Sequence, residues 1–181
     1  MIVVLGLGNF KEEYLHTRHN VGFDVTDRIA AFFQKKMKKR CFRNYASVCL
    51  PEKDAVLVQP WTFMNNSGKV VRYFPKNAKY VVICDNMDLN CGALRIKQGG
   101  GGSGQKGLAS VASALGTDDF VRVYVGIGRP DAGVSVNDHV LGREEKNAAR
   151  LNEALDMAAR AVCDLLDGIS LEKIKSEYNR K

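Results

Sequence analysis

The segment IVVLGLGN, residues 2–9, decides how this chain is expected to fold. Its apolar run over residues 2–7 is typical of a strand that is buried on both faces of a parallel sheet. Glycine and a polar loop follow, and the next stretch has helical spacing. The order of strand, loop and helix indicates an α/β protein. The run is too short to span a membrane and lacks a basic leader, so we expect neither a membrane span nor a signal peptide.

Helical and strand-like patterns alternate along the rest of the chain. Apolar residues recur at helical spacing over residues 20–39, and the cations at the end of this stretch suit the negative end of a helix, with an RNA contact as the alternative. The alternation predicts one three-layer α/β domain over residues 1–181, with a mixed, mostly parallel twisted sheet flanked by helices. We expect further strands at residues 45–50, 55–59, 80–84, 93–97 and 121–127, and further helices at residues 66–74, 108–115, 143–167 and 171–178.

The composition favours a polyanionic partner and a reducing compartment. The chain has 27 Lys and Arg against 20 Asp and Glu, a net charge of +7 that attracts nucleic acid or an anionic membrane surface. A basic surface without a specific partner is the alternative. The five cysteines have neither CxxC spacing nor a histidine at zinc-like spacing. We therefore expect no metal, no cofactor and no disulfide, and a cytoplasmic protein.

Two glycine-rich segments raise the question of a nucleotide site. Residues 6–8 follow a strand, but the third glycine of a dinucleotide-binding motif is replaced by Lys11. Residues 101–106, within the glycine-rich segment 99–107, resemble a phosphate loop, yet Gln105 precedes the lysine and Gly107 follows it in place of a hydroxyl residue. These departures argue against a dinucleotide enzyme and a nucleotide triphosphatase. The backbone amides of the second segment remain candidates for a nucleic-acid phosphate, and a flexible connector is the alternative.

Several polar residues are expected at the carboxyl ends of strands, where ligands bind in such sheets. Asn9 and Asp85 each follow an apolar run, and the glycine-rich segment follows another strand. His19 lies in a polar loop and becomes a candidate general base if a carboxylate such as Asp85 orients its imidazole. Asn9 and Asn65 offer neutral amide donors, whereas Asn66 is well placed as a helix cap. Ordinary structural roles remain the alternative for each of them.

Five motifs in order along the chain resemble the bacterial-type peptidyl-tRNA hydrolase family. The resemblance covers most of the length, and its motifs are specific. They lie at residues 6–9 with Tyr14 and 17–22, at 62–69, at 85–89 with Gly92, at 99–108 and at 126–130.

The resemblance implies hydrolysis of the ester bond between a peptide and its tRNA, which frees the tRNA for reuse in translation. It implies that His19 is the catalytic base, that Asp85 orients it, and that Asn9 and Asn65 place substrate and water. An ester to a ribose is easier to cleave than an amide, so a neutral imidazole that deprotonates water suffices without a metal or a covalent nucleophile.

The same resemblance implies the residues that contact substrate. Tyr14 and Phe63 are expected to line the site, and Arg95 and Lys97 to hold tRNA phosphates. Lys106 is a further candidate for a phosphate or an oxyanion. The expected partner is peptidyl-tRNA, with no membrane and no obligate protein partner, and we expect a monomer.

Two departures from the family pattern leave an alternative open. Phe10-Lys11 stand where the family has Pro-Gly, and Gln105-Lys106 stand where it has His-Asn. A lysine donates hydrogen bonds but cannot accept them, so Lys106 cannot replace a bridging amide. A non-catalytic RNA-binding protein of the same fold is therefore the runner-up. A small-molecule esterase or amidase is a weaker third interpretation, because the basic charge and the complete motif order disfavour it.

Overall fold

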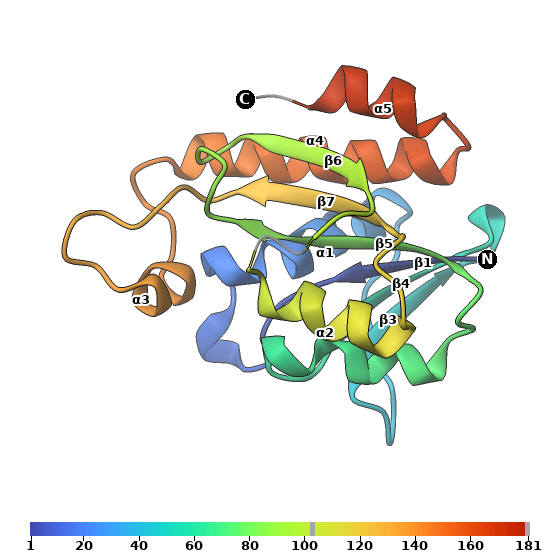
Figure 1. Cartoon of the computed structure of the whole chain (residues 1–181). Coiled ribbons are helices and arrows are strands. Elements are labelled where there is room, and N and C mark those ends of the chain that lie inside the picture. Colours follow the sequence, from blue (N-terminus) through green and yellow to red (C-terminus); the bar gives the residue numbers. More distant parts are fainter. Residues whose placement is uncertain (102–103, 180–181) are drawn as a thin grey trace.

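A computed structural model describes residues 1–101 and 104–179, which form one mixed sheet of seven strands with helices on both faces (Figure 1). The strand order across the sheet is β2-β3-β4-β1-β5-β7-β6. The four central strands β4, β1, β5 and β7 are parallel, while β3, β2 and β6 run antiparallel to their neighbours. The strands are β1 (Ile2–Gly6), β2 (Lys38–Lys39), β3 (Tyr45–Leu50), β4 (Ala55–Pro60), β5 (Lys79–Asn86), β6 (Leu94–Gln98) and β7 (Val121–Gly126).

Helices cover the two faces of this sheet, which confirms the predicted three-layer α/β architecture. α1, α4 and α5 pack on one face, and η4 and α2 pack on the other. Figure 1 shows α4 and α5 on one side of the strands and α2 on the opposite side. The helices are η1 (Glu12–Tyr14), η2 (Arg18–Asn20), α1 (Val21–Phe32), η3 (Pro51–Lys53), η4 (Met64–Tyr73), α2 (Lys106–Leu115), α3 (Val136–Leu141), α4 (Ala148–Leu166) and α5 (Leu171–Tyr178).

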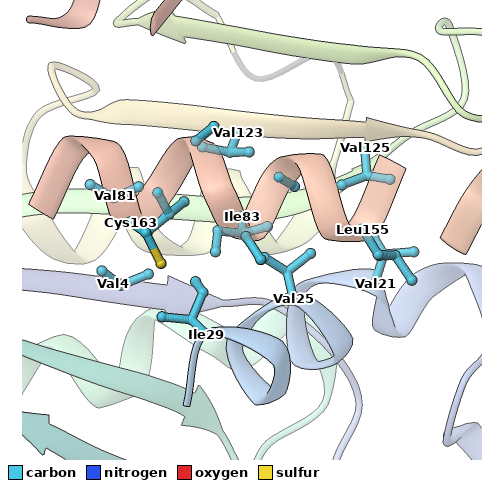
Figure 2. Close-up of a cluster of buried hydrophobic side chains, with 14 of the residues drawn as sticks. Val4, Val21, Val25, Ile29, Val81, Ile83, Val123, Val125, Leu155 and Cys163 are labelled. Atoms are coloured by element: carbon cyan, nitrogen blue, oxygen red, sulfur yellow. The ribbon is translucent and has the colours of Figure 1, made fainter. Parts of the chain in front are cut away.

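The sheet is apolar on both faces because each face is covered. Successive strand residues point to opposite sides, so Val4 packs toward α1 while Val3 packs toward α2 and η4. Val21, Val25 and Ile29 place one apolar stripe of α1 against Val4 and its neighbours, as Figure 2 shows. The continuous apolar run of β1 thus reflects burial on both sides.

The structure corrects the predicted end of α1. The helix ends at Phe32 instead of continuing to residue 39, and Gln34 adopts the left-handed conformation with φ of 54°. The chain reverses there, and Lys38 and Lys39 pair with β3 as the short strand β2. The interpretation as partners of a helix end is therefore wrong for Lys38 and Lys39, which lie in a strand at the edge of the sheet. Lys35, by contrast, lies just after the helix end, and its backbone nitrogen donates to the carbonyl oxygen of Ala30.

Two further helix boundaries differ from prediction. The helix predicted from residue 66 begins at Met64 and is a 3₁₀ helix, so Asn66 is not its cap. α4 begins at Ala148 instead of residue 143, because residue 143 pairs with Thr17 in an isolated β-bridge and is not free to start the helix.

The helix α3 was not predicted at all. Among residues 1–101 and 104–179, no helix has the length and apolar character needed to cross a bilayer.

Candidate active site

Close packing of α1 against β1 places His19 beside the centre of the sheet. A Cβ atom at Gly22, in the first turn of α1, would lie 2.3 Å from the backbone nitrogen of Leu7. A Cβ atom at Gly6, the last residue of β1, would lie 2.2 Å from the carbonyl oxygen of Gly22. Glycine at both positions allows the contact that larger residues would block. His19, three residues before Gly22, is thereby held at the carboxyl end of β1.

His19 forms a hydrogen bond with Asp85 from the neighbouring strand β5. Its Nδ1 lies 2.9 Å from Oδ1 of Asp85, and the two side chains are 16% and 4% exposed. An ionised carboxylate only accepts hydrogen bonds, so this contact favours the tautomer that carries its proton on Nδ1. Nε2 of His19 is then the nitrogen that can take a proton from a water molecule.

Gln105 contacts the same carboxylate oxygen of Asp85 as His19 does, and sequence reasoning missed this role. Its Nε2 donates to Oδ1 of Asp85 at 2.9 Å, while its Oε1 accepts from the backbone amides of Gly107 and Leu108 at 2.5 and 3.0 Å. Gln105 is thus the N-cap of α2 and connects that helix to Asp85. Its position just before a predicted helix was the available signal, since a glutamine amide both donates and accepts.

A pocket of about 370 Å³ opens beside the pair of His19 and Asp85. Lys106, exposed at the start of α2, lines the same pocket, and its role as a substrate contact stays a prediction. A larger hollow of about 570 Å³ lies between α1 and α4, but it contains neither member of the pair, so we place the candidate site at the smaller one. The lining residues are His19, Asp85, Asn86, Met87, Gly104, Gln105, Lys106, Val136, Asn137 and Val140.

One wall of the pocket was not predicted from the sequence. Val136, Asn137 and Val140 come from α3, whose short sequence carries no motif that we identified. The predicted phosphate-binding loop includes Gly102 and Ser103, which lie outside the described residues.

Asn9 is buried in a network that fixes the orientation of its side chain. Its Oδ1 accepts a hydrogen bond from the backbone nitrogen of Met64 at 2.9 Å. Asn20 holds its backbone, donating to the carbonyl oxygen and accepting from the amide, each at 2.9 Å. Because the side-chain oxygen is engaged, the Nδ2 amide of Asn9 is the group left to donate. Asn20, just after His19, was not identified from the sequence.

The remaining predicted contacts are not among the residues that line the pocket. Phe63 is 47% exposed, and its ring centre lies 5.4 Å from that of Phe10. Asn65 is exposed in η4, one residue beyond Met64, and Tyr14 is half-buried in η1. Arg95 and Lys97 lie on the edge strand β6, opposite Tyr124 and Arg122 of β7. Both alternate with buried Leu94 and Ile96, so they point toward the face of the sheet that α2 covers.

The chemistry available at the pocket is that of a base, a carboxylate and amide donors. Burial raises the pKa of the Cys84 thiol well above its usual value, so the cysteine next to Asp85 stays protonated and is a poor nucleophile. Within the described part of the chain, no three His, Cys, Asp or Glu side chains are grouped as metal ligands. The arrangement suits activation of a water molecule by His19.

Comparison with known proteins agrees with this geometry. A family model described as peptidyl-tRNA hydrolase matches residues 3–181. The peptidyl-tRNA hydrolase of Shouchella clausii is 40% identical over 169 residues, covering 90% of this chain and 91% of that protein. The peptidyl-tRNA hydrolase of Bacillus subtilis is 36% identical over 188 residues, and the match covers 100% of both chains. The crystal structure of the Acinetobacter baumannii peptidyl-tRNA hydrolase is 30% identical, with a TM-score of 0.88 over 99% of this chain and 94% of that one. The chain belongs to the peptidyl-tRNA hydrolase family, as its motifs predicted.

Proposed function

We propose that this protein hydrolyses the ester bond between a peptide and tRNA, with His19 as the general base. The observation that carries the proposal is the 2.9 Å contact between Nδ1 of His19 and the carboxylate of Asp85 at the edge of the pocket. This contact orients the imidazole and leaves its second nitrogen available to water. General-base catalysis of this kind needs no covalent intermediate.

The reaction follows from the roles of these groups. Nε2 of His19 takes a proton from water while the water oxygen attacks the ester carbonyl. Asp85 keeps the proton on Nδ1 and stabilises the imidazolium that forms. The carbonyl oxygen becomes an oxyanion, which the Nδ2 amide of Asn9 is available to stabilise. His19 then returns the proton to the ribose oxygen as the ester bond breaks, giving a free peptide carboxyl group and tRNA.

Selection for N-blocked substrates follows from the amide donors near the site. Asn9 and the exposed Asn65 can donate hydrogen bonds to a peptide carbonyl group. A free α-ammonium group brings a positive charge and no acceptor, so the same donors would leave it poorly solvated. Tyr14 and Phe63 are proposed to contact the substrate beyond these amides.

Cations around the pocket are proposed to hold the RNA. Lys106 shares the pocket with His19, and Arg95 and Lys97 extend from the β6 edge on the face that α2 covers. Lysine and arginine bind phosphate oxygens irrespective of base sequence, which suits an enzyme that accepts many tRNAs. Lys106 also replaces the family's asparagine, so it supplies charge where relatives supply an amide.

The setting of the reaction is part of the same proposal. All five cysteines are free, which supports a reducing cytoplasm. One continuous sheet joins strands from β1 to β7, which supports a single domain over residues 1–181. We propose a monomer that acts on tRNA without an obligate protein partner.

The test is hydrolysis of an N-acetylated aminoacyl-tRNA by the wild-type protein and by His19→Ala, with the unblocked aminoacyl-tRNA as a substrate control. We expect cleavage of the blocked substrate alone, and a loss of about 100- to 10,000-fold in the variant. His16→Ala is the matched control, because His16 also pairs with an aspartate, Asp24, at 2.9 Å but lies outside the pocket. Wild-type protein that binds tRNA without cleaving it would instead support the RNA-binding alternative, which the family match disfavours.

A further inference from the structure

Three aromatic rings form a partly exposed surface next to the candidate active site. The ring centre of Phe10 lies 6.5 Å from that of Trp61 and 5.4 Å from that of Phe63. Phe63 is 47% exposed, and the other two are half-buried. These three residues, here called the aromatic shelf, line a hollow of about 370 Å³ distinct from the pocket of His19. Grouped aromatic rings left open to water are typical of a binding surface.

Cations surround the aromatic shelf. Nζ of Lys39 lies 4.5 Å from the ring centre of Trp61, and Arg43 and Lys69 line the same hollow. Of the nine described residues that line it, none is acidic, and the others are Asn44, Thr62 and Asn66. The hollow therefore combines flat apolar rings with positive charge, which is the combination that binds bases and phosphates together.

The fold connects the aromatic shelf to the catalytic residues through one hydrogen bond. Phe10 directly follows Asn9, Phe63 directly precedes Met64, and the Met64 amide donates to the side chain of Asn9 at 2.9 Å. Lys39 comes from β2, which forms the edge of the sheet opposite β6. The shelf thus lies on the other side of the site from Arg95 and Lys97.

We propose that the aromatic shelf binds unpaired RNA nucleotides, with bases stacked on its rings and phosphates held by Lys39, Arg43 and Lys69. The inference rests on the proposed function, since it names the part of the substrate next to the ester-bearing ribose. Stacking on aromatic rings is tolerant of base identity, and the cations supply the salt-dependent part of the affinity. An apolar peptide would use the rings but would gain nothing from three cations without acidic neighbours, so RNA fits better.

Trp61 allows a direct test, because it is the only tryptophan in the chain. A single-stranded oligoadenylate without any ester is titrated into the wild-type protein while tryptophan fluorescence is followed at low and high salt. We expect quenching as a base stacks on Trp61, with an affinity that falls as salt rises. A double-stranded RNA of the same length is expected to quench much less, because its bases are already stacked.

Two variants and one control locate the binding. Phe10→Ala and Lys39→Ala are each expected to weaken oligoadenylate binding by roughly tenfold. Phe32→Ala is the control, because Phe32 is 73% exposed at the end of α1 and does not line the hollow. Its affinity is expected to match that of the wild type. Melting temperatures of all variants separate lost binding from lost folding.

The outcomes separate this inference from the proposed function. Hydrolysis of the N-acetylated substrate without quenching by oligoadenylate, or quenching that survives both Phe10→Ala and Lys39→Ala unchanged, would overturn the aromatic shelf as an RNA site. Quenching by an N-acetylated peptide and not by RNA would overturn it in favour of a peptide site. Oligoadenylate binding that both variants weaken would support it even if hydrolysis failed.

Discussion

At the scale of single residues, the carboxylate of Asp85 is the centre of the site. It accepts hydrogen bonds from His19 and from Gln105, each at 2.9 Å, and is almost completely buried. A buried carboxylate with two donors is confined to one rotamer, so the imidazole it faces is confined as well. We therefore regard Gln105 as a positioning residue that acts through Asp85.

Replacing Gln105 tests this role. Gln105→Leu removes both the hydrogen bond to Asp85 and the cap of α2, and we expect kcat on peptidyl-tRNA to fall about tenfold or more. Gln105→His, which restores the family's residue and a ring nitrogen donor, is expected to recover most of the activity. The melting temperature is measured beside kcat. If Gln105→Leu lost stability alone and kept kcat, the residue would be a helix cap and nothing more.

The sequence predicted the chemical groups of the site better than their arrangement. The motifs identified His19, Asp85 and Asn9 as a set, and the structure places His19 against Asp85 and buries Asn9 nearby. Gln105 was treated only as a break in a motif, because a pattern compares residue types and does not report hydrogen bonds. Asn20, whose side chain forms hydrogen bonds with the backbone of Asn9, was not identified for the same reason.

At the scale of elements, the contact between α1 and β1 determines where His19 lies. Gly22→Ala adds a methyl group that would lie 2.3 Å from the nitrogen of Leu7 and 2.6 Å from the oxygen of Ile83. Both are backbone atoms in the centre of the sheet, so the helix must shift. We expect the free energy of unfolding to fall by about 1–3 kcal/mol. We also expect kcat to fall by a larger factor than the fraction of folded protein, because the shift of α1 displaces His19.

Urea unfolding and kcat measured on the same samples check this expectation. Gly101→Ala is the matched control, because a Cβ atom there would meet no atom of the described residues within 4 Å, and the φ of Gly101 lies outside the left-handed region. That variant is expected to keep the stability of the wild type. Unchanged stability in Gly22→Ala would mean that the helix can move away from β1 without cost.

The bounds of elements were predictable where local signals agreed. β3 matches its prediction because a turn ends it at Pro51, and α5 matches from Leu171 to Tyr178. The end of α1 was not predictable, because Phe33 and Met37 continue the apolar spacing and are partly buried after the helix has ended. The left-handed Gln34 that ends it has no distinctive sequence signal, since glycine or asparagine is usual there.

At the scale of the whole molecule, the site lies between two groups of cations on opposite edges of the sheet. Arg95 and Lys97 lie on β6, and Lys39 lies on β2. Together with the net charge of +7, this distribution favours an extended polyanion that crosses the site. The composition predicted a polyanionic partner. The placement of cations at both edges of the sheet could be recognised only once the strand order was known.

The salt dependence of tRNA binding measures how many cations take part. In Arg95→Gln combined with Lys97→Gln, we expect the slope of log affinity against log salt to become shallower by about 1.4–1.8, since each phosphate contact contributes roughly 0.7–0.9. Lys79→Gln is the control, because Lys79 is exposed at the start of β5 and Asp85 lies near the other end of that strand. An unchanged slope in the double variant would exclude β6 from the RNA contact.

The alternation of apolar patterns predicted the three layers, but the position of each strand depends on distant pairings. β6 follows β5 and precedes β7 in the sequence, yet it lies at the edge of the sheet and runs antiparallel to β7. Its strand-like pattern predicts neither its position nor its direction. The order of strands is set by which long-range contacts bury the most apolar surface, and no local window contains that information.

The central position of β1 has a consequence for how this protein is made. β1 lies between β4 and β5, and both neighbours are synthesised after it. His19 leaves the ribosome 66 residues ahead of Asp85, so the growing chain carries its base long before the carboxylate that orients it. Base and carboxylate can therefore meet only after β5 has been synthesised and has paired with β1.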